Sequence, residues 1–330
     1  AGRGLPGFDI VGLPDKEVQE SRERVKTAIL SSRIEFPQKK ITVNLAPADV
    51  PKEGSAYDLP IAVGILATLT NCPIPEKSLF FGELSLSGDL RHTKGALLLA
   101  LFAKEKGYKN VFVPRDSANE AAIVRGVNVY PVENLLQLLA HFSGRETIST
   151  CERTLTPDVD GGTSGVESEF DMKDVLGQEQ AKRAMEIAAA GGHNILLVGN
   201  PGAGKTMLAR ALPSILPPLN EIESLEATKI HSAAGIIPPG GALLVARQFR
   251  SPHHTTSPAG LIGGGSRPHP GEISLAHRGV LFLDEFNEFS RSVLESLRQP
   301  LEDGFVTISR SQERVLYPAR FMLVASANPC

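Results

Sequence analysis

One stretch, Gly199 to Thr206, constrains the fold and function of this 330-residue chain more than any other. It reads Gly-Asn-Pro-Gly-Ala-Gly-Lys-Thr and fits the phosphate-binding pattern G-x-x-x-x-G-K-[ST] at every fixed position. A mostly apolar run, 194–198, precedes it, and good helix formers, 207–212, follow it. This is the strand–loop–helix context that the pattern requires, so the sequence predicts a nucleotide-binding loop.

The residues of this loop have distinct physical roles. Gly202 and Gly204 let the backbone turn so that its N–H groups point at phosphate oxygens, and the following helix presents its positive end to them. Lys205 supplies a positive charge to the β- and γ-phosphates, and Thr206 supplies a hydroxyl ligand for Mg²⁺. The residues predicted here to bind the nucleotide are Gly199, Asn200, Pro201, Gly202, Ala203, Gly204, Lys205, Thr206 and Met207.

Two later apolar runs end in polar residues that suit the same site. The first, Gly279–Leu283, is dense enough for a strand buried on both faces and leads into Asp284 and Glu285. In this fold Asp284 would hold Mg²⁺ through water, and Glu285 would act as the general base toward the attacking water. The second run, 320–327, ends at Asn328. The sequence therefore predicts a site that binds ATP with Mg²⁺ and hydrolyses it.

Composition argues against several other classes of protein. The formal net charge is −3, so no strong overall attraction to nucleic acid or to a membrane is expected. The three cysteines, Cys72, Cys151 and Cys330, lie far apart and suit a reducing cytosol better than a disulfide framework. The longest apolar run, 59–69, is too short to span a bilayer, and no signal peptide opens the chain. We expect a cytoplasmic protein that does not enter membranes.

The pattern of short apolar segments predicts two α/β domains, 1–145 and 170–330, joined by a flexible linker at 146–169 that is rich in Thr, Ser, Gly and acids. In the first domain, helices are expected over 16–31, 58–70, 96–106 and 133–142, and strands over 40–45, 80–88, 111–113 and 128–130. In the second, an amphipathic helix is expected over 290–301.

Between the loop and Asp284 lies a segment with an unusual charge balance. From Lys229 to Arg278 its single acid is Glu272, whereas basic residues and histidines are frequent and three consecutive glycines lie at 263–265. One interpretation is a mobile basic loop that contacts nucleic-acid phosphates. Two alternatives are a zinc site, which adjacent histidines without a nearby cysteine disfavour, and a Gly-rich insertion packed between subunits. The candidate DNA contacts are Arg250, His253, His254 and Arg267.

Two further stretches carry a resemblance to a known family. Gly4–Asp15, Gly-Leu-Pro-Gly-Phe-Asp-Ile-Val-Gly-Leu-Pro-Asp, and Asn44–Asp49, Asn-Leu-Ala-Pro-Ala-Asp, resemble the bacterial ComM/YifB proteins, which are AAA+ ATPases of magnesium-chelatase type. The likeness extends over nearly the whole chain. It implies a degenerate Lon-protease-like α/β domain of the ribosomal S5 domain 2-like fold, incomplete at its start. A P-loop AAA+ core of three αβα layers would follow and stop before its C-terminal lid.

The resemblance also implies roles for individual residues. Val175 and Gly177, in the segment Val-Leu-Gly-Gln, would lie against the adenine. Asn328 would be the sensor residue that helps to place the attacking water. The lid, and the arginine that reaches a neighbouring subunit's ATP, would follow residue 330, so we expect these 330 residues alone to hydrolyse ATP slowly.

As a whole, the resemblance implies a hexameric motor that uses ATP and Mg²⁺ to act on DNA, in branch migration during natural transformation and recombination. Two alternatives stay open. One is a magnesium-chelatase-like ATPase subunit that drives metal insertion into a tetrapyrrole. The other is an ATP-gated scaffold without DNA activity.

The sequence departs from Lon at both catalytic positions of that peptidase. In alignment on Pro51–Gly54, the family's serine nucleophile falls on Ala56, and Ser55 is one place off. In alignment on the later Gly-Glu stretch, its lysine falls on Leu97, and Lys94 is three residues away. Because the lysine of such a pair lowers the barrier to deprotonating the serine, we expect the fold without peptidase activity.

Overall fold

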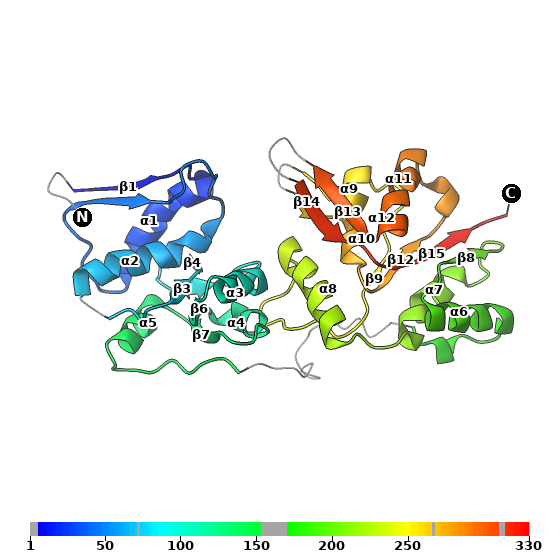
Figure 1. Cartoon of the computed structure of the whole chain (residues 1–330), viewed down its shortest axis with the longest axis horizontal. Coiled ribbons are helices and arrows are strands. Elements are labelled where there is room, and N and C mark those ends of the chain that lie inside the picture. The colour runs from blue at the N-terminus through cyan, green and yellow to red at the C-terminus, as the bar shows by residue number, and fades with distance from the viewer. Residues whose placement is uncertain (1–5, 71–72, 153–169, 266–267, 310–313, 330) are drawn as a thin grey trace. The chain divides into compact units, whose positions relative to one another are not determined.

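The computed structural model describes residues 6–70, 73–152, 170–265, 268–309 and 314–329, so the predicted linker lies outside the described residues from 153 onward. Contacts divide the chain into two compact units. We call them the first unit, Ala1–Thr156 with Ile237–Ala242, and the second unit, Pro157–Ile236 with Leu243–Cys330. Each is a mixed α/β structure that contains a parallel sheet (Figure 1). Among the described helices, none has the length and apolar character that crossing a membrane requires.

The strands of the first unit are β1 (Gly7–Val11), β2 (Lys40–Asn44), β3 (Ser78–Phe80), β4 (Glu83–Leu84), β5 (Leu90–Arg91), β6 (Asn110–Pro114) and β7 (Asn128–Val132). Its helices are α1 (Lys16–Ser31), α2 (Asp58–Thr70), α3 (Ala96–Glu105), α4 (Arg115–Ala122) and α5 (Leu135–Phe142), with a 3₁₀ turn, η1 (Ser55–Tyr57). The main sheet is parallel in the order β3-β6-β7, and β1-β2 and β4-β5 form separate pairs. At the centre of the main sheet, Phe112 of β6 stacks on Phe80 of β3 and Tyr130 of β7, with ring centroids 4.8 and 4.6 Å away.

Local sequence explains why the first helix begins where it does. The Asp15 carboxylate accepts a hydrogen bond of 2.8 Å from the backbone N–H of Val18, which satisfies one of the free donors at the start of α1. The predicted apolar face, Val18, Val25, Ala28 and Ile29, is fully buried. The expectation of helices at 16–31 and 58–70 is therefore confirmed.

The single strand expected over 80–88 is wrong, because the chain changes its hydrogen-bonding partner there. β3 ends at Phe80, and the next two backbone N–H groups turn to different carbonyls. Phe81 donates to Phe112, whereas Gly82 donates to Ala56. The chain then pairs as the short antiparallel hairpin β4-β5.

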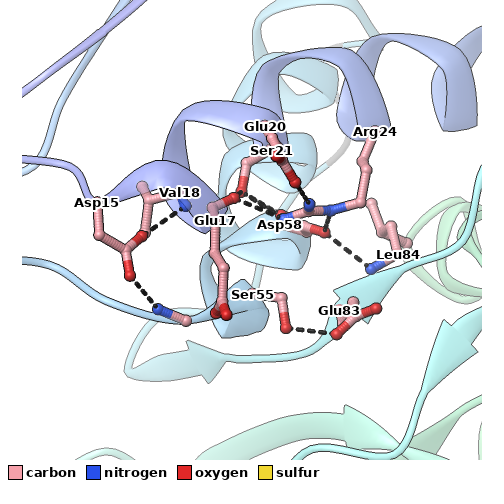
Figure 2. Close-up of polar contacts among 11 residues, drawn as sticks. Asp15, Glu17, Val18, Glu20, Ser21, Arg24, Ser55, Asp58, Glu83 and Leu84 are labelled. Carbon is pink, nitrogen blue, oxygen red and sulfur yellow. Dashed lines mark hydrogen bonds and ion pairs between the residues drawn. The ribbon is translucent and has the colours of Figure 1, made fainter. Parts of the chain in front are cut away.

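A buried carboxylate joins three elements of the first unit (Figure 2). Asp58, the first residue of α2, has no exposed side-chain surface and accepts hydrogen bonds from Arg24 of α1 at 2.7 and 3.1 Å. It also accepts from the Ser21 hydroxyl and, at 3.1 Å, from the backbone N–H of Leu84 in β4. A buried charge is stable only when it is paired and hydrogen-bonded, so this cluster fixes α1 and β4 against α2.

The strands of the second unit are β8 (Ile195–Val198), β9 (Phe249–Arg250), β10 (Gly263–Gly264), β11 (His269–Pro270), β12 (Val280–Leu283), β13 (Phe305–Ser309), β14 (Arg314–Pro318) and β15 (Met322–Ala327). Its α-helices are α6 (Glu179–Gly191), α7 (Lys205–Ala211), α8 (Glu221–Ala234), α9 (Pro258–Ile262), α10 (Glu272–Leu275), α11 (Arg291–Ser296) and α12 (Arg298–Asp303). Three 3₁₀ turns are η2 (Met172–Asp174), η3 (Leu212–Ile215) and η4 (Phe286–Glu288).

The central sheet of the second unit is parallel in the order β8-β15-β12-β9. All four residues of β12 are buried, as the dense apolar run predicted. Val280 and Phe282 pack into one apolar cluster with residues of α6 and α7, whereas Leu281 and Leu283 pack into another with residues of α9 and α11. Because successive side chains of a strand point to opposite faces, helices cover both faces of this sheet.

The helix expected over 290–301 is divided into α11 and α12 at Leu297. Pro300 explains the division, because it has no backbone N–H to donate to the carbonyl of Ser296 four residues earlier. The predicted face is retained only in part: Leu297 is 3% exposed, whereas Leu301 is 40% exposed.

Two buried histidines are expected to make the stability of the second unit depend on pH. His231 Nε2 lies 3.1 Å from the carbonyl oxygen of Leu275, and His277 Nε2 lies 3.2 Å from the carboxylate of Glu226. Burial lowers the pKa of both imidazoles below the ordinary value of 6.5. In the unfolded chain both return to that value, so below it the unfolded chain takes up protons that the folded unit does not.

Stability should therefore be complete above about pH 6.5 and fall as the pH drops below it. Scanning calorimetry between about pH 7.5 and 5.5 measures this, since each kcal/mol lost lowers the melting temperature of a unit of this size by about 2–4 °C. The matched control is His231→Gln, which keeps a donor for the Leu275 carbonyl and should reduce the pH dependence. A melting temperature that is flat across this range would contradict the prediction.

Candidate nucleotide site

The predicted site residues follow three neighbouring strands of the central sheet. The loop 199–206 follows β8, Asn328 follows β15, and Asp284 and Glu285 follow β12. Because these strands are parallel and adjacent, their carboxyl ends meet at one edge of the sheet, where ligands bind in open α/β folds. The sequence order alone did not establish this adjacency.

The loop has the backbone that its glycines were expected to allow. Gly202 and Gly204 have φ angles of +79° and +80°, in the left-handed region that favours glycine, and α7 begins at Lys205. The N–H of Gly199 donates to the carbonyl of Ala327 at 3.3 Å, which attaches the start of the loop to β15. Met207 packs against the apolar core of the unit.

Lys205 connects the loop to the end of β15. Its ammonium group donates to the carbonyl oxygens of Gly199 at 2.6 Å and Asn200 at 3.0 Å, and to Oδ1 of Asn328 at 2.9 Å. The structure therefore brings together a cation and an amide that lie 123 residues apart in the sequence. Phosphate oxygens can take the place of these acceptors around the ammonium group.

Thr206 and Asp284 form a second direct link across the site. The Thr206 hydroxyl donates to Oδ2 of Asp284 at 2.9 Å. A hydroxyl and a carboxylate are hard oxygen donors of the kind that Mg²⁺ prefers, and Mg²⁺ sites in phosphate-binding proteins use one or two such groups. The residues present therefore fit this ion. The described residues contain no group of three or more His, Cys, Asp or Glu that could hold a metal, so the zinc alternative gains no support there.

Ser326 is a site residue that the sequence reasoning missed. It is 1% exposed, and its hydroxyl donates to Oδ1 of Asp284 and accepts from the backbone N–H of Glu285 at 3.2 Å. The same N–H lies 3.1 Å from Oδ1 of Asp284. The serine thus fixes the carboxylate that Thr206 contacts on its other oxygen. The usable signal was a lone polar residue within an otherwise apolar strand, at a level that only the β12-β15 register reveals.

Glu285 leaves the end of β12 in a left-handed conformation, with φ of +52°. Its side chain is 55% exposed, and one carboxylate oxygen lies 3.6 Å from Nδ1 of His254. Its backbone, by contrast, is held by Asp284 and Ser326. The carboxylate is therefore accessible to water while its attachment point is fixed, which suits a general base.

The segment predicted to contact adenine lies beside the loop. The Gln178 side-chain amide donates to the carbonyl oxygen of Ala203 at 3.0 Å. Two residues before it, the chain is anchored by Val175, which is 1% exposed in the same core as α7. Gly177 has φ of +66°, with open space where a side chain would begin. The contact with adenine itself stays a prediction.

The candidate DNA contacts differ in how accessible they are. Arg250 forms a bidentate ion pair with Glu272, with distances of 2.6 and 2.7 Å, so its charge is neutralised within the unit. His253 is exposed, and its ring lies 4.0 Å from that of His254. Arg267 lies outside the described residues. DNA binding by these four residues stays a prediction.

The first unit does not pair a serine with a lysine at the positions expected for Lon (Figure 2). The hydroxyl of Ser55 instead donates to the carboxylate of Glu83. Ala56 occupies the nucleophile position, Leu97 is fully buried in α3, and Lys94 is exposed. A carboxylate partner orients a serine but leaves no lysine here to take its proton.

Comparisons with known proteins give two family matches. The model described as "Magnesium chelatase, subunit ChlI" matches residues 171–330, and "Subunit ChlI of Mg-chelatase" matches residues 1–117. A magnesium-chelatase 38 kDa subunit from Rhodobacter capsulatus is 30% identical over 48% of this chain and 50% of its own length. The second match thus contains the whole candidate site.

Longer matches extend over both units. The YifB protein of Salmonella typhimurium is 47% identical over 99% of this chain and 63% of its own length. Competence protein ComM of Haemophilus influenzae is 44% identical over 99% of this chain and 64% of its own length. The chain thus spans less than two thirds of the length of these relatives. Identity of this extent over both units shows that the chain belongs to the ComM/YifB family.

Proposed function

We propose that this protein is a Mg²⁺-dependent AAA+ ATPase whose nucleotide site is built on the loop 199–206. The observation that carries the proposal is the convergence of three strand ends, in which Lys205 contacts Asn328 and Thr206 contacts Asp284, each at 2.9 Å. A glycine-rich turn without a function has no need of these partners. Membership of a magnesium-chelatase-like family supports the same conclusion.

The roles follow from the geometry. Loop N–H groups and Lys205 would bind the phosphates, and Val175 and Gly177 would border the adenine. Thr206 and Asp284 would hold Mg²⁺, which when bound neutralises charge on the phosphates. Ser326 keeps the Asp284 carboxylate in place. Glu285 would accept a proton from the attacking water, and Asn328 would help to place that water.

For the first unit we propose a Lon-like fold that has lost peptidase chemistry and acts as a docking platform. The missing serine–lysine pair supports the loss, because Leu97 is fully buried where a lysine would be needed. For the assembly we propose a hexamer, since hydrolysis in such ATPases uses an arginine from a neighbouring subunit at the γ-phosphate.

For the whole protein we propose a motor that acts on DNA, in branch migration during natural transformation and recombination. The name of the Haemophilus influenzae relative, a competence protein, supports this choice. A magnesium-chelatase-like role is the second candidate, and the match over 171–330 favours it. That match does not extend to the close similarity of the first unit to YifB and ComM.

ATP turnover by the full-length protein, with and without single-stranded and branched DNA, tests the proposal. We expect Mg²⁺-dependent turnover that DNA accelerates. Turnover that ignores DNA would overturn the motor and favour the chelatase-like candidate. ATP binding without turnover would instead favour a scaffold.

A further inference from the structure

The carboxylate of Glu285 has a partner that the reaction itself does not require. Nδ1 of His254 lies 3.6 Å from one of its oxygens, and the two side chains are 32% and 55% exposed. This separation is an ion-pair contact and is too long for a hydrogen bond. Among the described side chains, His254 is the partner recorded within 4 Å of this carboxylate.

The topology of the sheet produces this contact. β9 is the parallel neighbour of β12, with Arg250 opposite Leu281, so both strands end at the same edge. The chain leaves β9 through the buried Pro252 and reaches His254 four residues after Arg250. The end of β12 lies two residues before Glu285. The segment after β9 therefore arrives where the proposed general base emerges.

Contacts on both sides hold the imidazole of His254 there. The His253 ring is 4.0 Å away, and the ring of Phe289 meets it edge-on at 6.5 Å and 83°. Phe289 is 4% exposed and ends η4, the turn that begins directly after Glu285. A backbone hydrogen bond of 2.9 Å from Thr256 to His253 closes the turn that carries the histidines.

We propose that His254 is a positioning residue that restrains Glu285. The proposal rests on the ATPase function proposed above. A general base needs a carboxylate oxygen that is free to accept a proton from water. An oxygen attracted to an imidazole is less available for that transfer, because the contact biases the side chain toward His254. Movement of the segment 251–257 would then control hydrolysis without changing how ATP is bound.

The test compares His254→Ala with His254→Gln in the full-length protein. Alanine removes the partner, whereas the glutamine amide can still donate to the carboxylate. We expect His254→Ala to raise the rate constant for ATP turnover about two- to fivefold, the range for a partly exposed charge pair, with the dissociation constant for ATP unchanged. His254→Gln should stay near the wild-type rate.

A second comparison separates restraint of Glu285 from an unrelated effect. In a Glu285→Gln background, the restraint has nothing to act on, so adding His254→Ala should leave the residual single-turnover rate unchanged. An increase that persists in this background, or an unchanged or lower rate for His254→Ala alone, would overturn the inference. If neither the wild type nor His254→Ala hydrolyses ATP, the proposed function fails as well. An active wild type with an indifferent His254→Ala overturns the inference alone.

Discussion

A Glu285→Gln variant is expected to hydrolyse ATP roughly 10²–10⁴-fold more slowly than the wild type, the range for loss of one well-placed general base. Glutamine has nearly the same shape but cannot accept a proton. ATP affinity should be unchanged, because the Glu285 carboxylate points to His254, whereas Lys205 and Thr206 contact other groups. Phosphate release and equilibrium binding of a fluorescent ATP analogue measure the two quantities separately.

Glu288→Gln is the matched control for this variant. Glu288 lies in η4, three residues after Glu285, and its side chain is exposed. The substitution removes the same charge from the same turn, so turnover should stay within about twofold of wild type, as for most surface substitutions. If Glu285→Gln behaves like Glu288→Gln, the general base lies elsewhere and the role assigned to Glu285 is wrong.

The parts of the site that could be predicted are those in which a short segment carries its own physical requirement. The loop needs positive φ angles at Gly202 and Gly204, and glycine supplies them in the sequence. A strand covered on both faces needs an unbroken apolar run, which β12 has. Helix α1 was equally readable, because its cap and its apolar face lie within one continuous segment.

The contacts that could not be predicted depend on which strands are neighbours. Ser326 contacts Asp284, and His254 contacts Glu285, only because β15 and β9 lie on either side of β12. Nothing in a strand's own sequence records its neighbour. β9 is also only two residues long, too short to give a period that could have been recognised.

Competing local signals explain the remaining differences. Leucines at helical spacing favoured one helix over 290–301, but the missing N–H of Pro300 ends α11 early. In the first unit, alternation over 80–88 indicated one strand, yet the backbone at Gly82 bonds to Ala56 from another part of the chain. In both cases a backbone hydrogen bond decided the structure against the side-chain pattern.

The buried carboxylate of the first unit leads to a second large expected effect. Arg24→Met should lower the free energy of unfolding of this unit by about 3–5 kcal/mol, the cost of leaving one member of a buried ion pair without its partner. Asp58 has no exposed side-chain surface, and the side chain of Arg24 is 19% exposed. The pair is strong enough that hydrogen bonding to Asp58 raises the pKa of Arg24 above its ordinary value. Methionine preserves much of the apolar stem but leaves the Asp58 charge facing only Ser21 and the backbone N–H of Leu84.

Hydrogen exchange of the α1 and α2 amides measures this loss locally, without assuming that both units unfold together. Arg22→Met is the matched control on the same helix, because Arg22 is 50% exposed and pairs with the neighbouring Glu23, a contact worth less than about 1 kcal/mol. Adding Asp58→Asn to Arg24→Met removes the unpaired charge and keeps an acceptor for Leu84. The double variant should therefore be more stable than Arg24→Met alone. If Arg24→Met is as mild as Arg22→Met, or Asp58→Asn destabilises it further, the buried charge is not what holds α1, α2 and β4 together.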